Sequence, residues 1–106
     1  MRVLLDECLP RKLRQELSGH EVRTAQEEGW AGLKNGALLQ AATGRFDVLH
    51  TVDRNIAFQQ NLQDLRIAII AMVATSNRLR DIRPLMDEVR RTLTLLKPGE
   101  VRRVGG

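Results

Sequence analysis

Two hydrophobic segments of the chain end in carboxylates. Residues 3–5 lead into Asp6 and Glu7, and residues 48–52 lead into Asp53. In an open parallel α/β sheet, ligands bind beyond the carboxyl ends of the strands, where the strand order reverses. If the two segments are adjacent strands at that point, Asp6 and Asp53 share one crevice. Carboxylates that lie close together repel each other, so such a pair binds a divalent cation or shares a proton.

The composition limits the class of protein. The chain has 106 residues, enough for one domain with a core and too few for two. Charged residues make up 28% and hydrophobic residues 42%, which is typical of a globular protein. The longest apolar stretch, residues 67–74, is far too short to span a membrane. We therefore expect a single domain over residues 1–106 with no membrane partner.

The cysteine content and the N-terminus indicate a cellular compartment. Cys8 is the single cysteine, which excludes an internal disulfide and fits a reducing environment. Its neighbours Asp6 and Glu7 disfavour a thiolate, so we interpret Cys8 as a packing residue. The chain begins with a strand-like segment and shows no signal-peptide pattern. These features predict a cytoplasmic protein.

Positive charge gathers in the last third of the chain. The formal net charge is +4, and from Arg78 onward seven arginines and one lysine stand against four acids. A basic region beside an acidic crevice suits a polyanion held near metal-binding carboxylates. The alternative is that these arginines only form the solvent-exposed face of a helix. Charge alone favours this alternative.

Strand-like and helix-like segments alternate along the chain. We predict strands at residues 2–5, 21–25, 47–52, 67–73 and 100–104, and helices from Pro10 to Gly19, over 36–43 after an Asn35 cap, and along an apolar face from 82 to 96, with one or two helical turns at 54–62. Single helices between strands imply right-handed crossovers and a three-layer α/β/α sandwich with a mostly parallel five-stranded sheet. The order 2-1-3-4-5 is the simplest that makes strands 1 and 3 neighbours. The polar fifth strand leaves its own direction open.

Two motifs carry a family resemblance. They are Leu-Leu-Asp-Glu-Cys-Leu-Pro at residues 4–10 and Leu-His-Thr-Val-Asp-Arg-Asn at 49–55. With them the chain resembles the small bacterial PIN-like proteins, which are related to the PIN ribonuclease domains of toxin–antitoxin systems. Gly-His-Glu-Val at 19–22, Phe-Asp-Val-Leu at 46–49 and Ser-Asn-Arg at 76–78 extend the resemblance over nearly the whole chain.

The resemblance implies a metal-dependent nuclease fold in which Asp6 and Asp53 bind Mg²⁺ or Mn²⁺. Glu7 and Asn35 are further candidate ligands. The chemistry would be in-line attack of water on a phosphodiester, helped by a metal that lowers the pKa of that water. The implied partners are RNA and an antitoxin protein, and a homodimer is left open.

Asn35 departs from the pattern of the family. PIN nucleases bring a further acid from the helical region between these strands, and many relatives have that acid where this chain has Asn35. Asn35 still offers a carbonyl oxygen, but the site loses one negative charge. Glu27 or Glu28 from the preceding turn are candidates to replace it. A site with fewer carboxylates binds Mg²⁺ more weakly, because that ion depends on charge to be held.

Each candidate residue also has a structural interpretation. Asp6 could cap the first helix, and Asp53 could begin an Asx-turn after the third strand. Arg54 and Asn55 could contact a phosphate or lie in solvent beside Asp53. Likewise, Asn77 and Arg78 follow the fourth strand at the same edge of the sheet. They could line the crevice or cap the next helix.

Three functions compete. The first is a metal-dependent ribonuclease. The second is a PIN-like module that binds RNA or a partner protein without catalysis, and Asn35, in place of an acid, favours this second function. The third is a receiver-like phosphoacceptor domain, which also has acids after its first and third strands. Thr75 and Ser76 fit that scheme, but Lys97 does not, because it precedes the fifth strand and a receiver lysine should end it.

Overall fold

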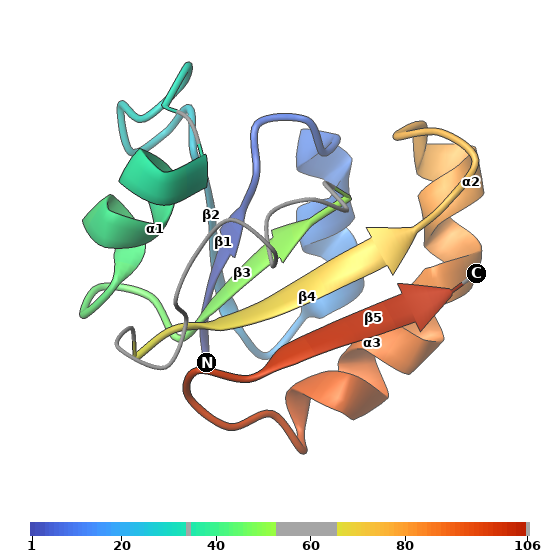
Figure 1. Ribbon diagram of the computed structural model, residues 1–106. Coiled ribbons are helices and arrows are strands. Elements are labelled where there is room, and N and C mark those ends of the chain that lie inside the picture. Colours follow the sequence, from blue (N-terminus) through green and yellow to red (C-terminus); the bar gives the residue numbers. More distant parts are fainter. Residues whose placement is uncertain (34, 53–65, 106) are drawn as a thin grey trace.

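In the computed structural model, which describes residues 1–33, 35–52 and 66–105, the strands form one parallel sheet (Figure 1). The strands are β1 (Arg2–Leu5), β2 (Glu21–Thr24), β3 (Val48–Thr51), β4 (Ala68–Val73) and β5 (Val101–Gly105). Their order is β2-β1-β3-β4-β5, and each neighbouring pair is parallel. The predicted order is confirmed, and the direction of β5 is now known.

Helices cover both faces of the sheet. They are η1 (Arg11–Leu17), α1 (Asn35–Ala42), α2 (Leu79–Ile82), η4 (Arg83–Leu85) and α3 (Met86–Leu93). Helix α1 lies on one face, whereas η1, α2 and α3 lie on the other (Figure 1). The predicted three-layer α/β/α sandwich is therefore confirmed. Among the described residues, no helix combines the length and apolarity that crossing a membrane requires.

The two faces bury separate hydrophobic cores. Under α1, the core contains Leu4, Ala25, Leu38, Leu39, Ala42, Phe46, Leu49, Ile67 and Ile69. Under η1, α2 and α3, it contains Val3, Leu5, Leu9, Leu13, Leu17, Val48, Ala68, Ile70, Met72, Ile82, Met86, Val89, Leu93 and Val104. Alternate residues of each strand enter opposite cores, because side chains of a strand point to opposite faces.

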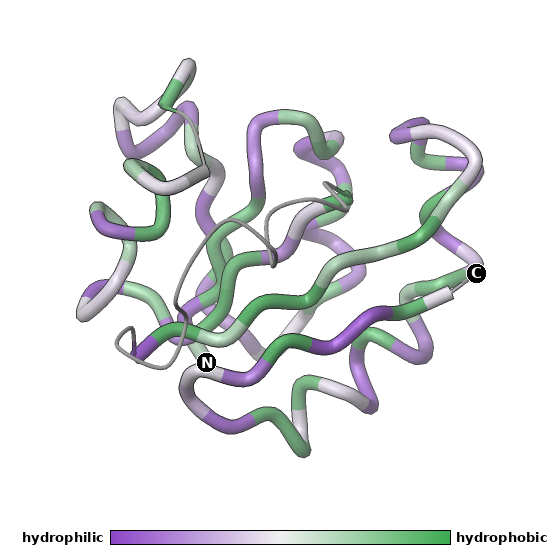
Figure 2. The backbone as a smooth tube through the Cα atoms, viewed as in Figure 1, coloured by the Kyte–Doolittle hydropathy of each residue, from purple (hydrophilic) through white to green (hydrophobic). Residues whose placement is uncertain are grey.

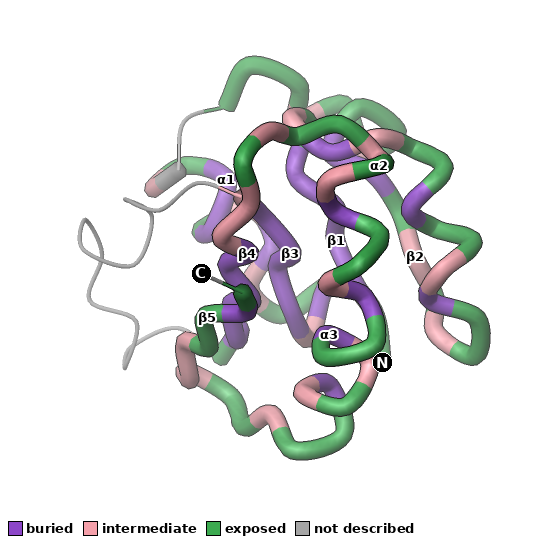
Figure 3. Tube along the Cα trace, turned by 90° about the vertical axis from the view of Figure 1, so that its right-hand side faces the viewer, coloured by how far each residue is buried: buried purple, intermediate pink, exposed green. Residues whose placement is uncertain are grey.

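The central strands are buried and the edge strands are polar. The tube of β4 is hydrophobic along its length, whereas that of β5 turns hydrophilic at Arg102 and Arg103 (Figure 2). All four residues of β3 and five of the six in β4 are buried (Figure 3). This confirms the prediction that the fourth strand is covered on both faces. Strand β3 is also paired with β1 on one side and β4 on the other, so its backbone is fixed up to its last residue.

Two helices differ from the predictions. The predicted helix from 82 to 96 is broken into α2, η4 and α3, and it ends at Leu93. Pro84 causes the break, because its ring lacks an N–H and clashes with the carbonyl of the preceding turn. The segment after Pro10 is a 3-10 helix, with no side-chain cap and no acid in its first turn to favour an α-helix.

Gly105→Ala should destabilise the protein strongly. Gly105 has φ +90°, and an added Cβ would lie 2.6 Å from the carbonyl oxygen of Val73. The backbone strain and the clash together should cost about 2–4 kcal/mol of unfolding free energy. Gly44→Ala is the matched control, since Gly44 has φ +84° and nothing within 4 Å of the added Cβ. It should cost only about 1 kcal/mol. Urea denaturation of both variants measures the difference, and equal losses would contradict the close contact at β5.

Candidate functional site

The carboxyl ends of β1 and β3 meet directly. Leu5 pairs with His50 in register, and the backbone N–H of Asp6 donates to the carbonyl oxygen of His50 at 3.0 Å. This bond extends the pairing one residue beyond β1. As a result, Asp6 lies beside Thr51, the last residue of β3.

The carboxylate of Asp6 is buried and held at both oxygens. Asp6 is 9% exposed. Its Oδ2 accepts a hydrogen bond from Thr51 Oγ1 at 2.7 Å, and its Oδ1 accepts one from the backbone N–H of Glu7 at 2.7 Å. A carboxylate has about four lone-pair sites, so each oxygen can still accept another partner. The two bonds fix the orientation of the carboxylate and leave it able to bind a cation.

Cys8 packs beside this carboxylate. The side chain is half-buried and lies against the core under η1. Burial, together with the negative charge of Asp6, raises the pKa of the Cys8 thiol above its usual value. The thiol therefore stays protonated near neutral pH and is a poor nucleophile. This agrees with the packing role predicted from its acidic neighbours.

Glu7 connects the end of β1 to the loop before α1. The chain turns after Asp6, so Glu7 is not placed on the opposite face as it would be in a continuing strand. The backbone N–H of Gly32 donates to both carboxylate oxygens of Glu7, at 3.2 and 3.1 Å, and Gln26 Nε2 donates to its carbonyl oxygen. Gly32 lies three residues before Asn35, the first residue of α1. Glu7 thus anchors the loop before α1 to the carboxyl end of β1, where Asp6 lies.

The loop after β4 also reaches the carboxyl end of β1. Asn77 Nδ2 donates to the carbonyl oxygen of Cys8 at 2.8 Å, which fastens this loop to the turn after β1. The backbone N–H of Arg78 donates to Ser76 Oγ at 3.0 Å, and Ser76 Oγ in turn donates to Asp81. Ser76 therefore holds the turn before α2, whose N-cap residue, Arg78, makes no side-chain capping bond. Arg78 is exposed at the start of α2.

Three predicted site residues, Asp53, Arg54 and Asn55, lie outside the described residues. Asp53 comes two residues after Thr51 in the chain. The predicted convergence of the Asp6 and Asp53 carboxylates stays a prediction.

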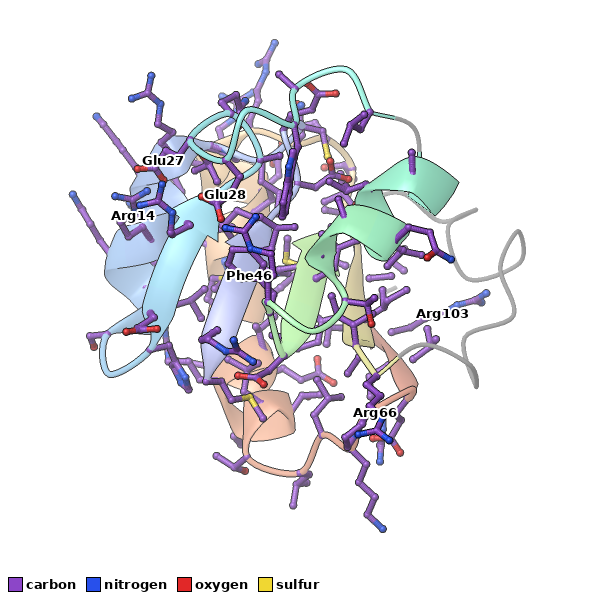
Figure 4. The ribbon with its side chains drawn as sticks, turned by 90° about the vertical axis from the view of Figure 1, so that its left-hand side faces the viewer. Arg14, Glu27, Glu28, Phe46, Arg66 and Arg103 are labelled. Carbon is purple, nitrogen blue, oxygen red and sulfur yellow. The ribbon has the colours of Figure 1, made fainter. Side chains whose placement is uncertain are left out.

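Glu27 and Glu28, the candidates to replace an acid at Asn35, are engaged elsewhere. Glu27 accepts from the backbone N–H of Thr24 at 2.9 Å and pairs with Arg14, which together lower its pKa (Figure 4). Glu28 pairs with Arg23 at 2.8 Å and with Arg45 at 3.7 Å. Both carboxylates therefore neutralise arginines near the β2 edge of the sheet. Neither makes a contact with Asp6.

Trp30 covers the edge of the core under α1. Its ring meets that of Phe46 edge-on, with centroids 5.9 Å apart and an interplanar angle of 77°. The guanidinium of Arg45 lies 5.3 Å from the centroid of Trp30. This cluster belongs to the core under α1, and its energy is that of packing plus a cation–π contact.

His50 is a buried polar residue of β3. It is 1% exposed, and neither ring nitrogen has a hydrogen-bond partner within the described part of the chain. Burial lowers the pKa of His50 to about 4. The ring is therefore neutral near pH 7 and points, by strand alternation, into the apolar core under η1. The sequence signal for a buried histidine is its place within an otherwise apolar strand.

The oxygen donors at this edge suit a hard divalent cation. The Asp6 carboxylate and the Thr51 hydroxyl are ligands of the type that Mg²⁺ and Mn²⁺ prefer. Across residues 1–33, 35–52 and 66–105, no three His, Cys, Asp or Glu side chains are grouped so that they could hold a metal ion. The predicted metal site would add the carboxylate of Asp53, which lies outside the described residues, to that of Asp6.

Comparisons of the chain with protein families, with curated proteins and with solved structures found no match. The assignment of a function rests on the geometry at the ends of β1 and β3.

Proposed function

We propose that this protein is a metal-dependent ribonuclease of the PIN-like type that acts in the cytoplasm. The observation that carries the proposal is the bond between Thr51 and Asp6 at the junction of β1 and β3. It places a buried carboxylate with free lone pairs at the switch point of a parallel sheet, which is where ligands bind in such folds. The motif at residues 49–55, which contains Asp53, begins in β3 with Thr51 and its neighbours.

Asp6 and Asp53 would hold Mg²⁺ or Mn²⁺, with Glu7 and Asn35 as further candidate ligands. The bound ion would lower the pKa of a water and neutralise charge that develops on the phosphate. Thr51 and the backbone N–H of Glu7 keep the Asp6 carboxylate in one orientation before any ligand arrives. Such preorganisation matters because a site that has to rearrange loses part of its binding energy.

The resemblance to PIN domains also suggests a biological setting. A toxin that cleaves RNA, held inactive by an antitoxin protein, is the role that the related ribonuclease domains play. A small adjacent gene that encodes a DNA-binding protein would support this role for the present chain.

A second candidate function is a PIN-like module that binds RNA or a protein without cleaving RNA. The engagement of Glu27 and Glu28 by arginines favours it, because neither acid is then available to restore the charge missing at Asn35.

The receiver-like alternative has no support from the position of Lys97. Because β5 is parallel to β4, Lys97 lies at the amino ends of the strands. There it lines a surface cavity with Asp47 and Arg66. Asp6 is at the opposite ends of the strands.

Asn35→Asp should turn a weak nuclease into a stronger one. We expect the wild type to cleave single-stranded RNA slowly with Mn²⁺ and still more slowly, or not at all, with Mg²⁺. The reason is that Mn²⁺ binds oxygen and nitrogen ligands more tightly and tolerates an irregular site. The added carboxylate should raise the rate with Mg²⁺ by about 10-fold or more. Gel analysis of a labelled RNA, with each metal in turn, measures the rates.

Gln40→Glu is the matched control for charge. It adds one negative charge to an exposed position of the same helix. We expect no gain of activity from it, because its position is in the second turn of α1, away from the anchored start. If both the wild type and Asn35→Asp bind RNA but cleave it with neither metal, the nuclease proposal fails and the binding module replaces it.

A further inference from the structure

Among the described residues, seven arginines form salt bridges with neighbouring acids: Arg2, Arg14, Arg23, Arg45, Arg83, Arg90 and Arg102. Seven other described cations are exposed and form no salt bridge: Arg11, Lys12, Arg66, Arg78, Arg80, Arg91 and Lys97. Four of these, Arg11, Lys12, Arg78 and Arg80, follow β1 and β4 at the carboxyl ends of the strands. We call these four residues the cationic strip.

The four residues are distant in sequence but adjacent in the fold. Arg11 and Lys12 begin η1, just after β1, whereas Arg78 and Arg80 lie at the start of α2, just after β4. Strands β1 and β4 flank β3, so their ends are about 10 Å apart. The bond from Asn77 to Cys8 fastens the two connecting loops to each other. Helices η1 and α2 cover the same face of the sheet (Figure 1), so the strip lies on that face, near the carboxyl ends of β1 and β4. Asp6 follows β1 at these same ends.

None of the four side chains forms a salt bridge with an acid of the described residues. Asp81 instead accepts a hydrogen bond from Ser76, and the Glu7 carboxylate accepts hydrogen bonds from the backbone N–H of Gly32. The cationic groups of the strip therefore remain available to bind anions. The guanidinium groups of Arg78 and Arg80 have the planar fork that binds phosphate through two hydrogen bonds.

We propose that the cationic strip binds the sugar–phosphate backbone of single-stranded RNA and leads it to Asp6. The proposal rests on the ribonuclease function for the identity of the polyanion. Trp30 and Phe46 pack against each other in the core under α1, and the strip itself contains no aromatic side chain on which a base could stack. Binding there is consequently directed at phosphates and tolerates many sequences.

The test is RNA binding without metal, which separates binding from cleavage. Fluorescence anisotropy of a labelled oligouridylate, in EDTA and from about 50 to 200 mM NaCl, gives the affinity and its salt dependence. Arg78→Gln with Arg80→Gln, and separately Arg11→Gln with Lys12→Gln, should each weaken binding several-fold. Each pair should reduce the slope of log affinity against log salt by about 1.4, since a single strand contributes about 0.7 for each phosphate contact.

Arg91→Gln with Lys97→Gln is the matched control, with the same change in net charge. These two exposed cations lie in α3 and in the loop that leads to the amino end of β5, away from Asp6. The control should change the affinity less than two-fold or so. A loss in the control as large as in the strip variants would overturn the proposal, as would normal binding by both strip variants. Displacement of the RNA by oligoglutamate of equal charge and at equal concentration would also overturn it, since the strip would then suit an acidic protein.

The same measurements distinguish this proposal from the nuclease proposal. Asp6→Asn should bind RNA at least as tightly as the wild type, because it removes only a negative charge. If the wild type cleaves no RNA but the strip variants alone lose RNA binding, the proposal for the strip is supported and the nuclease proposal is refuted. Metal-dependent cleavage with full activity in both strip variants supports the nuclease and refutes the strip.

Discussion

Replacing Asp6 by Asn should lower metal-dependent RNA cleavage by more than about 100-fold. Residues that only support a metal ligand already account for 10- to 100-fold in activity or affinity when they are changed. Asp6 would be a ligand itself, and Asn lacks its charge. The substitution keeps the size of the side chain and one oxygen that can accept the hydrogen bond from Thr51. The fold should therefore be unchanged, and cleavage of a labelled RNA with Mn²⁺ measures the loss of activity.

A thermal melt of the same variant tests the metal directly. Millimolar Mn²⁺ should raise the melting temperature of the wild type, because the ion binds the native state and not the unfolded chain. Asp6→Asn should abolish this shift. Without metal, the variant should be as stable as the wild type or slightly more stable, since the predicted like-charge repulsion between Asp6 and Asp53 would be removed.

Asp47→Asn provides the matched control for both measurements. Asp47 precedes β3 at its amino end, and its Oδ2 accepts the backbone N–H of Arg2 at 2.7 Å. That bond lowers the pKa of Asp47, so the variant should lose some stability. It should nevertheless keep cleavage and the response to Mn²⁺. If Asp6→Asn behaves in the same way, Asp6 is a structural cap of the first turn and not a metal ligand.

The second large effect concerns His50 and pH. In the folded protein the pKa of His50 is about 4, whereas an unfolded histidine titrates near 6.5. As the pH falls, the unfolded chain therefore binds the proton first, and the folded state loses stability from pH 6.5 downward. By pH 4 the loss should reach about 3 kcal/mol. Urea denaturation at a series of pH values measures it.

His50→Leu isolates the contribution of this one side chain. An apolar residue of similar volume leaves no unpaired ring nitrogen in the core, so the variant should be at least as stable at pH 7. Its stability should change little between pH 6.5 and 5. The carboxylates with lowered pKa values, Asp47, Glu27 and Glu100, add their own loss mainly below that interval. An unchanged pH dependence in His50→Leu would show that the ring is not buried in its neutral form.

The sequence predicted the sheet well because its signals are local and strong. Continuous apolar segments identified the buried strands, and single helices between them required the parallel order that the structure shows. The helix after β4 was predicted less well. Its apolar periodicity runs through Pro84, and the periodicity is a property of side chains, whereas the break is a property of the backbone.

The site was predicted in part for a different reason. The position of Asp6 follows from the end of β1, and the structure places it beside Thr51 as the strand order requires. The roles of Glu7 and Glu28 depend on partners that only the tertiary fold selects. Glu7 is held by a backbone N–H 25 residues away, and Glu28 by Arg45 across the turn into β3. Such contacts leave no periodic pattern in a sequence.

In the part of the chain that the structure describes, β2 and β5 are the outer strands of the open sheet, and both carry charged side chains. Glu21 and Arg23 are exposed on β2, and Arg102 and Arg103 are exposed on β5. An unpaired strand is a template for pairing with another chain, and charged side chains on it oppose that pairing because they would lose hydration. Neither edge therefore favours a longer sheet built from several copies. The charges at the two edges therefore oppose edge-to-edge association of two copies of this protein.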